Sequence, residues 1–444
     1  MYQLILNEDE DFKVTRQEYL KKFLKFYVFL SYTLLFYKFV SRRYNYVNFL
    51  NLLKIGGPLF IKIGQNIANK NNIDPDLKSC LTDLQDKNFA KNNIDSHTLR
   101  ETYFLDNLEE KPLASASIAS IFKCVYKGKD CIIKATHKNI RKDAIISINI
   151  FEGLRHRISN FSFLNLFNQL VDLNQIYKEL LDQTDLRNEV NNLNEISQNF
   201  KDKEFSDLII FPKVYYYDEN VIIESFEDGL ELKDFVDKYP ERKKEASHIV
   251  HCVFYKMFFD NCIHADMHFS NVRFKLENDK VKIVLYDFGL VSRIKEIEDY
   301  KVFINVYKKN MFVPDVMKFI GMIKKFNKNP GADLDNFEKE CIKYDQDKQI
   351  SYSLNKMHSG ITSDENYTST SVVIKKILEF AVENNLRIND YAFNICNGFI
   401  LLDDYNIFIS QLKSTLKERL DFANQNGFID DMRINVNKIF SGKK

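Results

Sequence analysis

The spacing of apolar residues predicts that the first part of this chain is helical. Apolar positions recur at helical intervals over residues 15–55, a stretch without proline or glycine. The residues Gly56-Gly57-Pro58 interrupt this pattern, and a second helix is predicted from about Leu59 to Asn69. Pro75 favours the start of a third helix, which continues through the apolar positions of Leu77–Gln85.

Runs of β-branched and aromatic residues predict strands further along the chain. Ile118–Tyr126 and Cys131–Lys134 flank a short polar segment with a glycine, which is the composition of a hairpin turn. Val272–Leu276 and Val281–Tyr286 form a second predicted hairpin around Glu277-Asn278-Asp279. The other predicted strands are Ile209–Tyr217 and Asn220–Glu224.

The remaining segments return to helical periodicity. It is present over residues 140–200, over 240–263 and in most of the chain beyond 297, while the polar stretch 345–370 is predicted to be a loop. A β-rich region is therefore followed by a helical half. This order predicts an α+β fold with two lobes and an N-terminal helical extension.

Composition and charge narrow the class of protein. The chain has 444 residues, of which 45% are hydrophobic, so it is long enough for two or three structural units. The 63 basic residues balance 62 acidic ones, and we expect no nucleic acid partner because such partners require a basic patch. The seven cysteines are scattered without a CxxC pair, which favours a reducing compartment.

The N-terminal region carries a short uncharged apolar segment, Phe26–Tyr37, between Lys25 and Lys38. Twelve helical residues cover about 18 Å of a bilayer core about 30 Å thick, so this segment is too short to span it. Two interpretations stay open: a helix lying in the membrane surface, or a helix packed in the core. The acidic residues between Glu8 and Asp11 leave no recognisable mitochondrial presequence, although a mitochondrial location is not ruled out.

Two polar clusters point to phosphoryl transfer. The first runs from His264 to Asn271 and contains Asp266, and the second contains Asp287 followed by Phe-Gly. An aspartate with an asparagine five residues later can position a nucleophile and ligate Mg²⁺, and the second aspartate supplies the charged metal ligand. We therefore predict Asp266 as catalytic and Asn271 and Asp287 as metal ligands.

Lys134 ends a predicted buried strand, where an ammonium needs a charged partner. In a kinase such a lysine binds the ATP phosphates and pairs with a helix glutamate, for which Glu189 is the candidate. The segment that would cover the phosphates is rich in alanine instead of glycine. The predicted nucleotide-binding residues are Ala114, Ser115, Ala116, Ser117, Lys134 and Glu224.

Together these features resemble the UbiB-type atypical kinases, the kinase-like family of ubiquinone biosynthesis. The most specific marker is the run from Gly57 to Gln65, which is similar to the K-x-G-Q helix of that family. Leu84-Gln85-Asp86 fits the same block, and the other motifs follow in the family's order. The resemblance covers about residues 45–295.

The resemblance implies a two-lobed protein-kinase-like fold. It would comprise a helical extension over residues 1–110, an N-lobe over 111–228 and a helical C-lobe over 229–444. Lys62 and Gln65 would project into the nucleotide cleft near Asp185, block peptide docking and act as regulatory residues. The implied cofactors are ATP and Mg²⁺. The implied partners are an isoprenoid or other lipid, a membrane surface and a lipid-biosynthetic protein complex.

The chain departs from the family pattern at Gln183, where a glutamate usually faces the K-x-G-Q lysine. Two hypotheses follow for the whole protein: an ATPase or small-molecule kinase at a membrane, or a catalytically weak nucleotide-binding scaffold. An ordinary protein kinase is disfavoured because no Gly-rich loop is present. His264 and His268 could suggest zinc, but no third ligand follows, and we expect them to brace the catalytic loop by hydrogen bonds.

Overall fold

A computed structural model gives the architecture of the chain. It describes residues 14–36, 42–68, 74–86, 95–157, 173–267, 271–307, 315–348, 350, 370–389, 391–392, 395–396, 398–399 and 416–441. Contacts divide the chain into two compact units, each considered by itself below. Unit 1 comprises Met1–Leu164, Asn174–Val190 and Lys213–Phe226. Unit 2 comprises Asn165–Leu173, Asn191–Pro212 and Glu227–Lys444.

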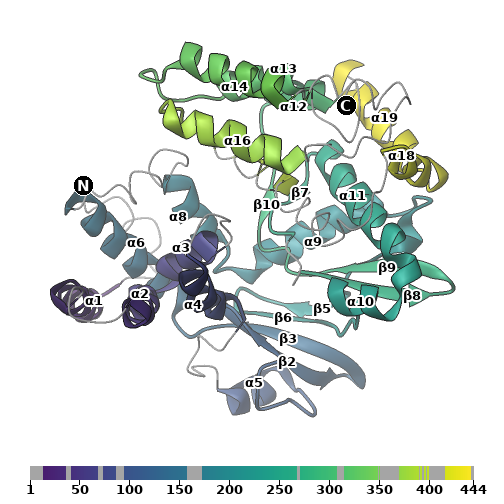
Figure 1. Cartoon of the computed structure of the whole chain (residues 1–444). Coiled ribbons are helices and arrows are strands. Elements are labelled where there is room, and N and C mark those ends of the chain that lie inside the picture. Colours follow the sequence, from purple (N-terminus) through teal and green to yellow (C-terminus); the bar gives the residue numbers. More distant parts are fainter. Residues whose placement is uncertain are drawn as a thin grey trace. The chain divides into compact units, whose positions relative to one another are not determined.

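Unit 1 begins with a group of packed helices, drawn in purple in Figure 1. They are α1 (Arg16–Phe36), α2 (Arg42–Gly56), α3 (Pro58–Ala68) and α4 (Pro75–Asp86), and α6 (Ile140–Arg157) packs against them. The predicted helices around Gly56-Gly57-Pro58 and after Pro75 are thus confirmed. Gly57 has φ +91°, a conformation that favours glycine, and Pro58 begins α3 where a proline costs no hydrogen bond.

One side of helix α1 packs against the rest of unit 1. The Phe26 ring is fully buried, with its centroid 4.9 Å from that of Phe60 on α3, and Phe60 in turn contacts Phe151 on α6. An ion pair between Lys22 and Asp143 ties α1 to α6 as well. Within the described part of the chain, no helix is long and apolar enough to cross a membrane.

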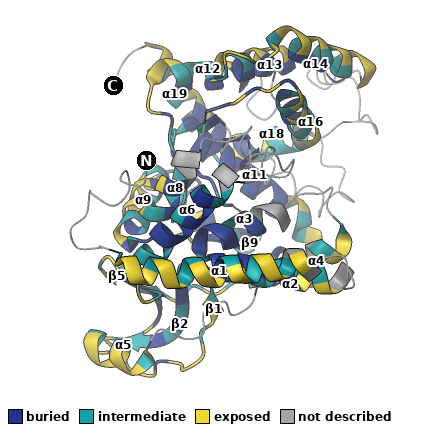
Figure 2. Cartoon of the chain, turned by 90° about the vertical axis from the view of Figure 1, so that its left-hand side faces the viewer, coloured by how far each residue is buried: buried dark blue, intermediate teal, exposed yellow. Residues whose placement is uncertain are grey.

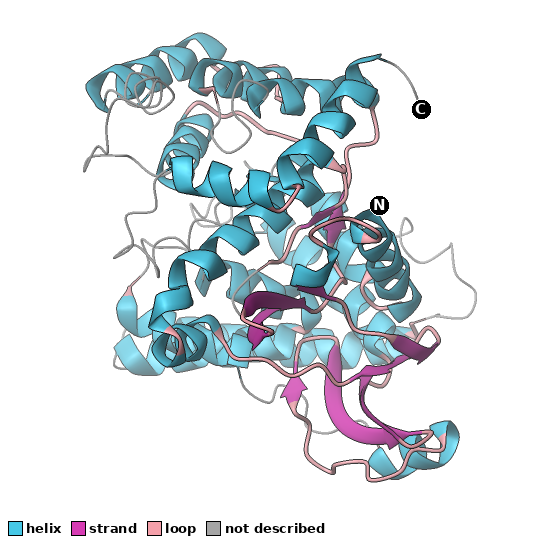
Figure 3. Cartoon of the chain, turned by 90° about the vertical axis from the view of Figure 1, so that its right-hand side faces the viewer, coloured by secondary structure: helices cyan, strands magenta, loops and turns pink. Residues whose placement is uncertain are grey.

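The rest of unit 1 is a five-stranded antiparallel sheet with the strand order β1-β2-β3-β6-β5 (Figure 3). The strands are β1 (Ala114–Ser115), β2 (Ala119–Tyr126), β3 (Lys129–Thr136), β5 (Val214–Tyr217) and β6 (Val221–Ser225). Leu99 and Tyr103 of helix α5 (Ser96–Tyr103) pack against the buried side chains of one face. Leu186 and Val190 of helix α9 (Leu186–Phe200) pack against Ile222.

The hairpin predicted around Gly128 is confirmed. Lys127 and Gly128 both have positive φ, which gives the right-handed strand twist that a two-residue turn requires. The ladder pairs Tyr126 with Lys129 and continues to Ala119 and Thr136, so the second strand is longer than predicted. The hairpin that turns at Asn278 and Asp279 in unit 2 has the same positive-φ pair.

One predicted strand is wrong. The run Ile209–Tyr217 is not continuous: β4 (Ile209–Ile210) pairs in parallel with β9 (Lys280–Leu285) in unit 2, whereas β5 belongs to the sheet of unit 1. The break falls at Pro212, which has no N–H to donate to a ladder. Strand β8 (Val272–Glu277) completes the three-stranded sheet of unit 2.

Unit 2 is otherwise mainly helical. Helix α11 (Lys243–Phe259) lies at its centre and is buried from Ala246 to Phe259 (Figure 2). The predicted helix over 240–263 thus ends at Phe259, and Asn261 has φ +56°. Helix α8 (Leu173–Asp182) belongs almost entirely to unit 1. The other helical elements of unit 2 are η2 (Ser206–Leu208), α10 (Leu232–Lys238), η3 (Pro240–Arg242), α12 (Ile297–Tyr307), α13 (Val316–Lys325), α14 (Leu334–Lys348), α16 (Thr370–Glu383), α18 (Leu416–Gln425) and α19 (Phe428–Ser441).

A buried ion cluster connects α11 to α19. Lys256, with a side chain only 2% exposed, pairs with Asp260 on its own helix and with Asp431 on α19 at 2.9 Å. Lys203 also reaches Asp431, and Asn435 donates to Asp260 at 2.6 Å. Burial raises the pKa of Asp260 to about 6. Removing a single member of such a group leaves the others as uncompensated buried charges.

We predict that Lys256→Met lowers the free energy of unfolding by about 3 kcal/mol at neutral pH. The pKa of Asp260 is higher in the folded chain, so its contribution to stability falls as pH rises from about 4 to about 6. Protonating Asp260 as pH falls through that window removes one uncompensated charge, so the defect of the variant should be smaller at about pH 5 than at about pH 7.5. Urea unfolding at about pH 7.5 and about pH 5 measures both effects.

The matched control is Lys244→Met on the same helix, because Lys244 forms an exposed ion pair with Glu418. This change should cost less than about 1 kcal/mol. An equally small effect of Lys256→Met at both pH values would contradict the prediction.

Candidate functional site

The strand-end lysine of unit 1 is paired as predicted. Lys134 lies on β3, between Ile121 on β2 and Ile222 on β6. Its Nζ donates to both carboxylate oxygens of Glu189 on α9, each at 2.7 Å, and both side chains are 12% exposed. The ion pair between a strand and a helix is therefore confirmed. Its role in binding nucleotide stays a prediction.

The alanine-rich segment forms a tight turn between β1 and β2. The amide of Ala116 donates to the carbonyl of Ala119 at 2.9 Å, and the hydroxyls of Ser115 and Ser120 lie 2.8 Å apart. His137 lies 2.9 Å from the carbonyl of Ala116 through Nε2. Burial lowers the pKa of His137, so its neutral ring can donate this hydrogen bond. The turn that holds Ala114, Ser115, Ala116 and Ser117 is thus fixed to the end of β3.

Glu224 lies on β6, the strand next to β3. It pairs in register with Ile132, two residues before Lys134, and with Val214 on the edge strand β5. The sheet thus carries both Lys134 and Glu224 on neighbouring strands of unit 1.

In unit 2, His264 braces the loop that contains Asp266. His264 is fully buried on β7 (Ile263–His264), which pairs with β10 (Val291–Ser292). Its Nδ1 accepts from the amide of Asp266 at 3.2 Å, and its Nε2 donates to the carbonyl of Tyr286 at 2.9 Å. The bracing role predicted for His264 is confirmed. His268 lies outside the described residues.

Asn271 closes the same loop. It is buried, and its side-chain nitrogen donates to the carbonyl of Asp266 at 2.9 Å. Because the nitrogen is used in this way, the amide oxygen is the atom that could ligate a cation. The carbonyl of Asn271 also accepts from the amide of Tyr286 at 3.0 Å, which connects this loop to the residue before Asp287.

Asp287 lies directly after β9, with an exposed side chain and a backbone φ of +56°. Few residues other than glycine adopt this conformation, and such positions cluster at functional sites. The next residue, Phe288, is buried, and its ring lies 5.3 Å from His264 and 6.0 Å from Phe211. The structure thus brings Asp266, Asn271 and Asp287 into one hydrogen-bonded segment of unit 2.

The oxygen donors of this segment fit a hard divalent cation. A carboxylate on Asp287 and an amide oxygen on Asn271 are ligands that Mg²⁺ takes, with waters and substrate phosphates completing its shell. Among the described residues, no group of three or more His, Cys, Asp or Glu side chains is arranged to hold a metal by itself.

Comparison with known families decides the relationship. The ABC1 atypical kinase-like domain matches residues 86–316, which is more than half of the chain. The chain belongs to this family. Its fold is accordingly an α+β kinase-like fold, as predicted, and the predicted relation to UbiB-type kinases is confirmed.

Relatives of the chain carry kinase names. A probable serine/threonine-protein kinase abkC from Dictyostelium discoideum is 27% identical over 249 residues, which are 52% of this chain and 35% of that protein. A probable protein kinase UbiB from Photobacterium profundum is 26% identical over 54% of this chain and 46% of its own length. The match thus spans between a third and a half of these relatives. Family membership supports a kinase or ATPase class.

Solved structures add little to this assignment. The complex of Rv3197 with erythromycin from Mycobacterium tuberculosis is 12% identical and has a TM-score of 0.41, covering 88% of this chain and 98% of that one. The Rio2 kinase with ADP/Mg²⁺ and phosphoaspartate from Chaetomium thermophilum has a TM-score of 0.30 at 10% identity, covering 68% and 96%. The fold assignment rests on the ABC1 family match.

The K-x-G-Q lysine of this ABC1-family chain contacts the residue in which the chain departs from its relatives. Lys62 on α3 donates to Oε1 of Gln183 at 2.9 Å, within unit 1. The acceptor is a neutral amide oxygen, so the ammonium of Lys62 makes a hydrogen bond here instead of an ion pair. Gln65 lies one turn later on α3, and its side chain is outside the described residues.

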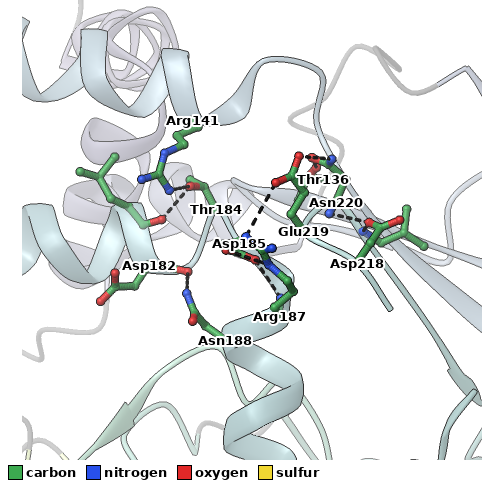
Figure 4. Close-up of polar contacts among 12 residues, drawn as sticks. Thr136, Arg141, Asp182, Thr184, Asp185, Arg187, Asn188, Asp218, Glu219 and Asn220 are labelled. Atoms are coloured by element: carbon green, nitrogen blue, oxygen red, sulfur yellow. Dashed lines mark hydrogen bonds and ion pairs between the residues drawn. The ribbon is translucent and has the colours of Figure 1, made fainter. Parts of the chain in front are cut away.

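Asp185 has a different partner from the one expected. Its carboxylate accepts three hydrogen bonds from the Arg187 side chain and one from the Arg187 amide, and the last of these caps the start of α9 (Figure 4). These bonds lower the pKa of Asp185 and keep it ionised. The amide of Leu186 donates to the carbonyl of Glu219 at 2.9 Å, so the β5–β6 turn also holds this helix end. Sequence reasoning missed Arg187 in this role.

We predict that Gln183→Glu raises the free energy of unfolding by about 0.5–1 kcal/mol, because the contact with Lys62 becomes a charge-assisted pair in a partly exposed position. In a Lys62→Ala background the same change should bring no gain. Chemical unfolding of the two single variants and the double variant gives the coupling between the residues. A gain that persists without Lys62 would show that the carboxylate acts elsewhere.

Proposed function

We propose that this chain binds Mg-ATP and transfers or hydrolyses the terminal phosphoryl group. The observation that carries the proposal is the part-buried ion pair of Lys134 and Glu189, which fixes a cation within strand β3 in a kinase-like fold. A scaffold that only recruits partners has no need for this pair together with an aspartate in a left-handed backbone conformation.

Each predicted residue has a distinct task in this proposal. Lys134, oriented by Glu189, would hold the α- and β-phosphates, and the turn of Ala114, Ser115, Ala116 and Ser117 would cover them. Glu224 would contact the rest of the nucleotide. Asp266 would orient the attacking hydroxyl or water. Asn271 and Asp287 would hold Mg²⁺, which when bound neutralises charge on the phosphates.

Lys62, Gln65 and Asp185 are proposed to be regulatory. The hydrogen bond from Lys62 to Gln183 holds helix α3 against the segment that leads into α9. Because α9 carries Glu189, a change in this docking would act on the partner of Lys134. An isoprenoid lipid or quinone precursor is the substrate class we propose, in association with a lipid-biosynthetic complex.

We predict that Asp287→Asn lowers Mg²⁺-dependent nucleotide turnover at least about a hundredfold, since an amide cannot replace the charge of the carboxylate ligand. The fold should remain intact, because the Asp287 side chain is exposed. Turnover and thermal unfolding of the purified variant measure the two effects. Wild-type turnover in this variant would remove Asp287 from the site, and no Mg-ATP binding by the wild-type protein would favour the scaffold alternative.

We also propose that α1 lies on a membrane surface. The side of α1 opposite Phe26 presents Leu20, Leu24, Val28 and Leu35 to solvent, with Val28 67% and Leu35 70% exposed. These positions are spaced by four, four and seven residues, which aligns them on one face of the helix, and Figure 2 shows exposed positions recurring along α1. Lys21 and Lys25 are exposed on the same helix and suit anionic lipid headgroups.

We predict that the double variant Leu24→Glu, Val28→Glu reduces co-sedimentation with vesicles of anionic phospholipid about tenfold, since it places two carboxylates in the apolar face. Phe104→Glu is the control, because Phe104 is 85% exposed elsewhere in unit 1 and should not matter. Nucleotide binding should be equal in all three proteins. Unchanged sedimentation of the α1 variant would exclude this face as the membrane contact.

A further inference from the structure

Asp287 is held from both sides by backbone contacts. The preceding residue, Tyr286, is fixed by His264 and Asn271 of the catalytic loop. The following residue, Phe288, has its carbonyl bound by Nδ2 of Asn192 at 2.8 Å. Asn192 comes from α9 and is far in the sequence from the segments 264–271 and 287–289, to which His264, Asn271 and Phe288 belong.

The orientation of the Asn192 amide is determined by its two partners. Its Oδ1 accepts from Nη2 of Arg293 at 2.9 Å, and a guanidinium can only donate. Its Nδ2 must therefore be the atom that faces the Phe288 carbonyl, which can only accept. Arg293 is itself fixed by Glu195, which it contacts through Nε and Nη2. The hydrogen bonds from Arg293 lower the pKa of Glu195 and keep it ionised.

Helix α9 thus supplies two contacts from neighbouring turns. Glu189, which pairs with Lys134, and Asn192 are three residues apart, a spacing that puts two side chains on one side of a helix. Asn192 and Glu195 are again three apart, and both engage the segment of residues 288–293. The same helix therefore carries the lysine partner in unit 1 and, in unit 2, the residue that binds the backbone beside Asp287.

We propose that Asn192 is a positioning residue for the metal-binding carboxylate of Asp287. Its hydrogen bond to the Phe288 carbonyl keeps the peptide after Asp287 in place, and this supports the left-handed backbone conformation that directs the carboxylate. Glu195 and Arg293 hold the Asn192 amide in the orientation that this requires. The effect of Asn192 on metal binding rests on the proposed function. Its effect on the backbone after Asp287 can be tested without any metal.

The test compares Asn192→Ala with Asn191→Ala, because Asn191 is the adjacent, exposed asparagine on the same helix. We expect Asn192→Ala to raise the Mg²⁺ concentration for half-maximal binding of ATP about tenfold, the effect of losing a hydrogen bond to a buried group. Nucleotide affinity in the presence of a chelator should be unchanged. Hydrogen exchange of the peptide over residues 286–292 should become faster without metal or nucleotide. Asn191→Ala should change none of these.

A second variant isolates the donated hydrogen bond. Asn192→Asp keeps an acceptor for Arg293 but cannot donate to the Phe288 carbonyl, so it should accelerate exchange over residues 286–292 as well. If the Asn192→Ala protein unfolds, Asn192→Asp still provides the exchange measurement.

Two results would overturn the proposal: exchange equal to wild type in both Asn192 variants, or a parallel loss of metal-free and Mg²⁺-dependent nucleotide binding. If the wild-type protein does not bind Mg-ATP, the proposed function fails. The exchange comparison then still decides whether Asn192 holds this segment.

Discussion

The ion pair of Lys134 and Glu189 is the constraint on which the architecture of unit 1 depends. A lysine ammonium with only 12% exposure cannot lie at a strand end without a carboxylate partner, because the loss of hydration costs several kcal/mol. The partner comes from a helix, so strand β3 and helix α9 must be held in one relative position. Asp185, Arg187 and the carbonyl of Glu219 do this by fixing the first turn of α9.

Helix α9 begins in unit 1 and continues in unit 2. In unit 1, Glu189 on its first turn pairs with Lys134. In unit 2, Asn192 and Glu195 contact the segment that follows Asp287.

Buried charge also organises the helical unit. Lys256 lies in the buried part of α11, and it is compensated by Asp260 and Asp431. Apolar residues of the same volume would stabilise the contact between α11 and α19 without requiring a particular alignment. The ion cluster forms in only one relative alignment of α11 and α19. This alignment defines where α19 packs.

Local chemistry was readable from the sequence. Turns at Gly128 and at Asn278 and the helix start at Pro58 follow from the conformations that single residues accept, whereas Lys134, predicted to end its strand, lies two residues inside β3. The pairing of Lys134 with Glu189 was also predictable, since a buried ammonium requires a carboxylate and the motifs supplied one candidate. The roles assigned to Asp266, Asn271 and Asp287 stay predictions, although the structure brings these residues into one segment.

Only the tertiary structure determines which backbone groups and which distant elements become the partners of a strand or a polar side chain. Sequence periodicity ran across Pro212 and could not show that β4 and β5 join different sheets. Asn192 had no visible role, because its acceptor is the carbonyl of Phe288 and every residue has a carbonyl. Residue type reveals which groups need a partner. Which of many equivalent partners each group receives depends on how the helices and strands pack.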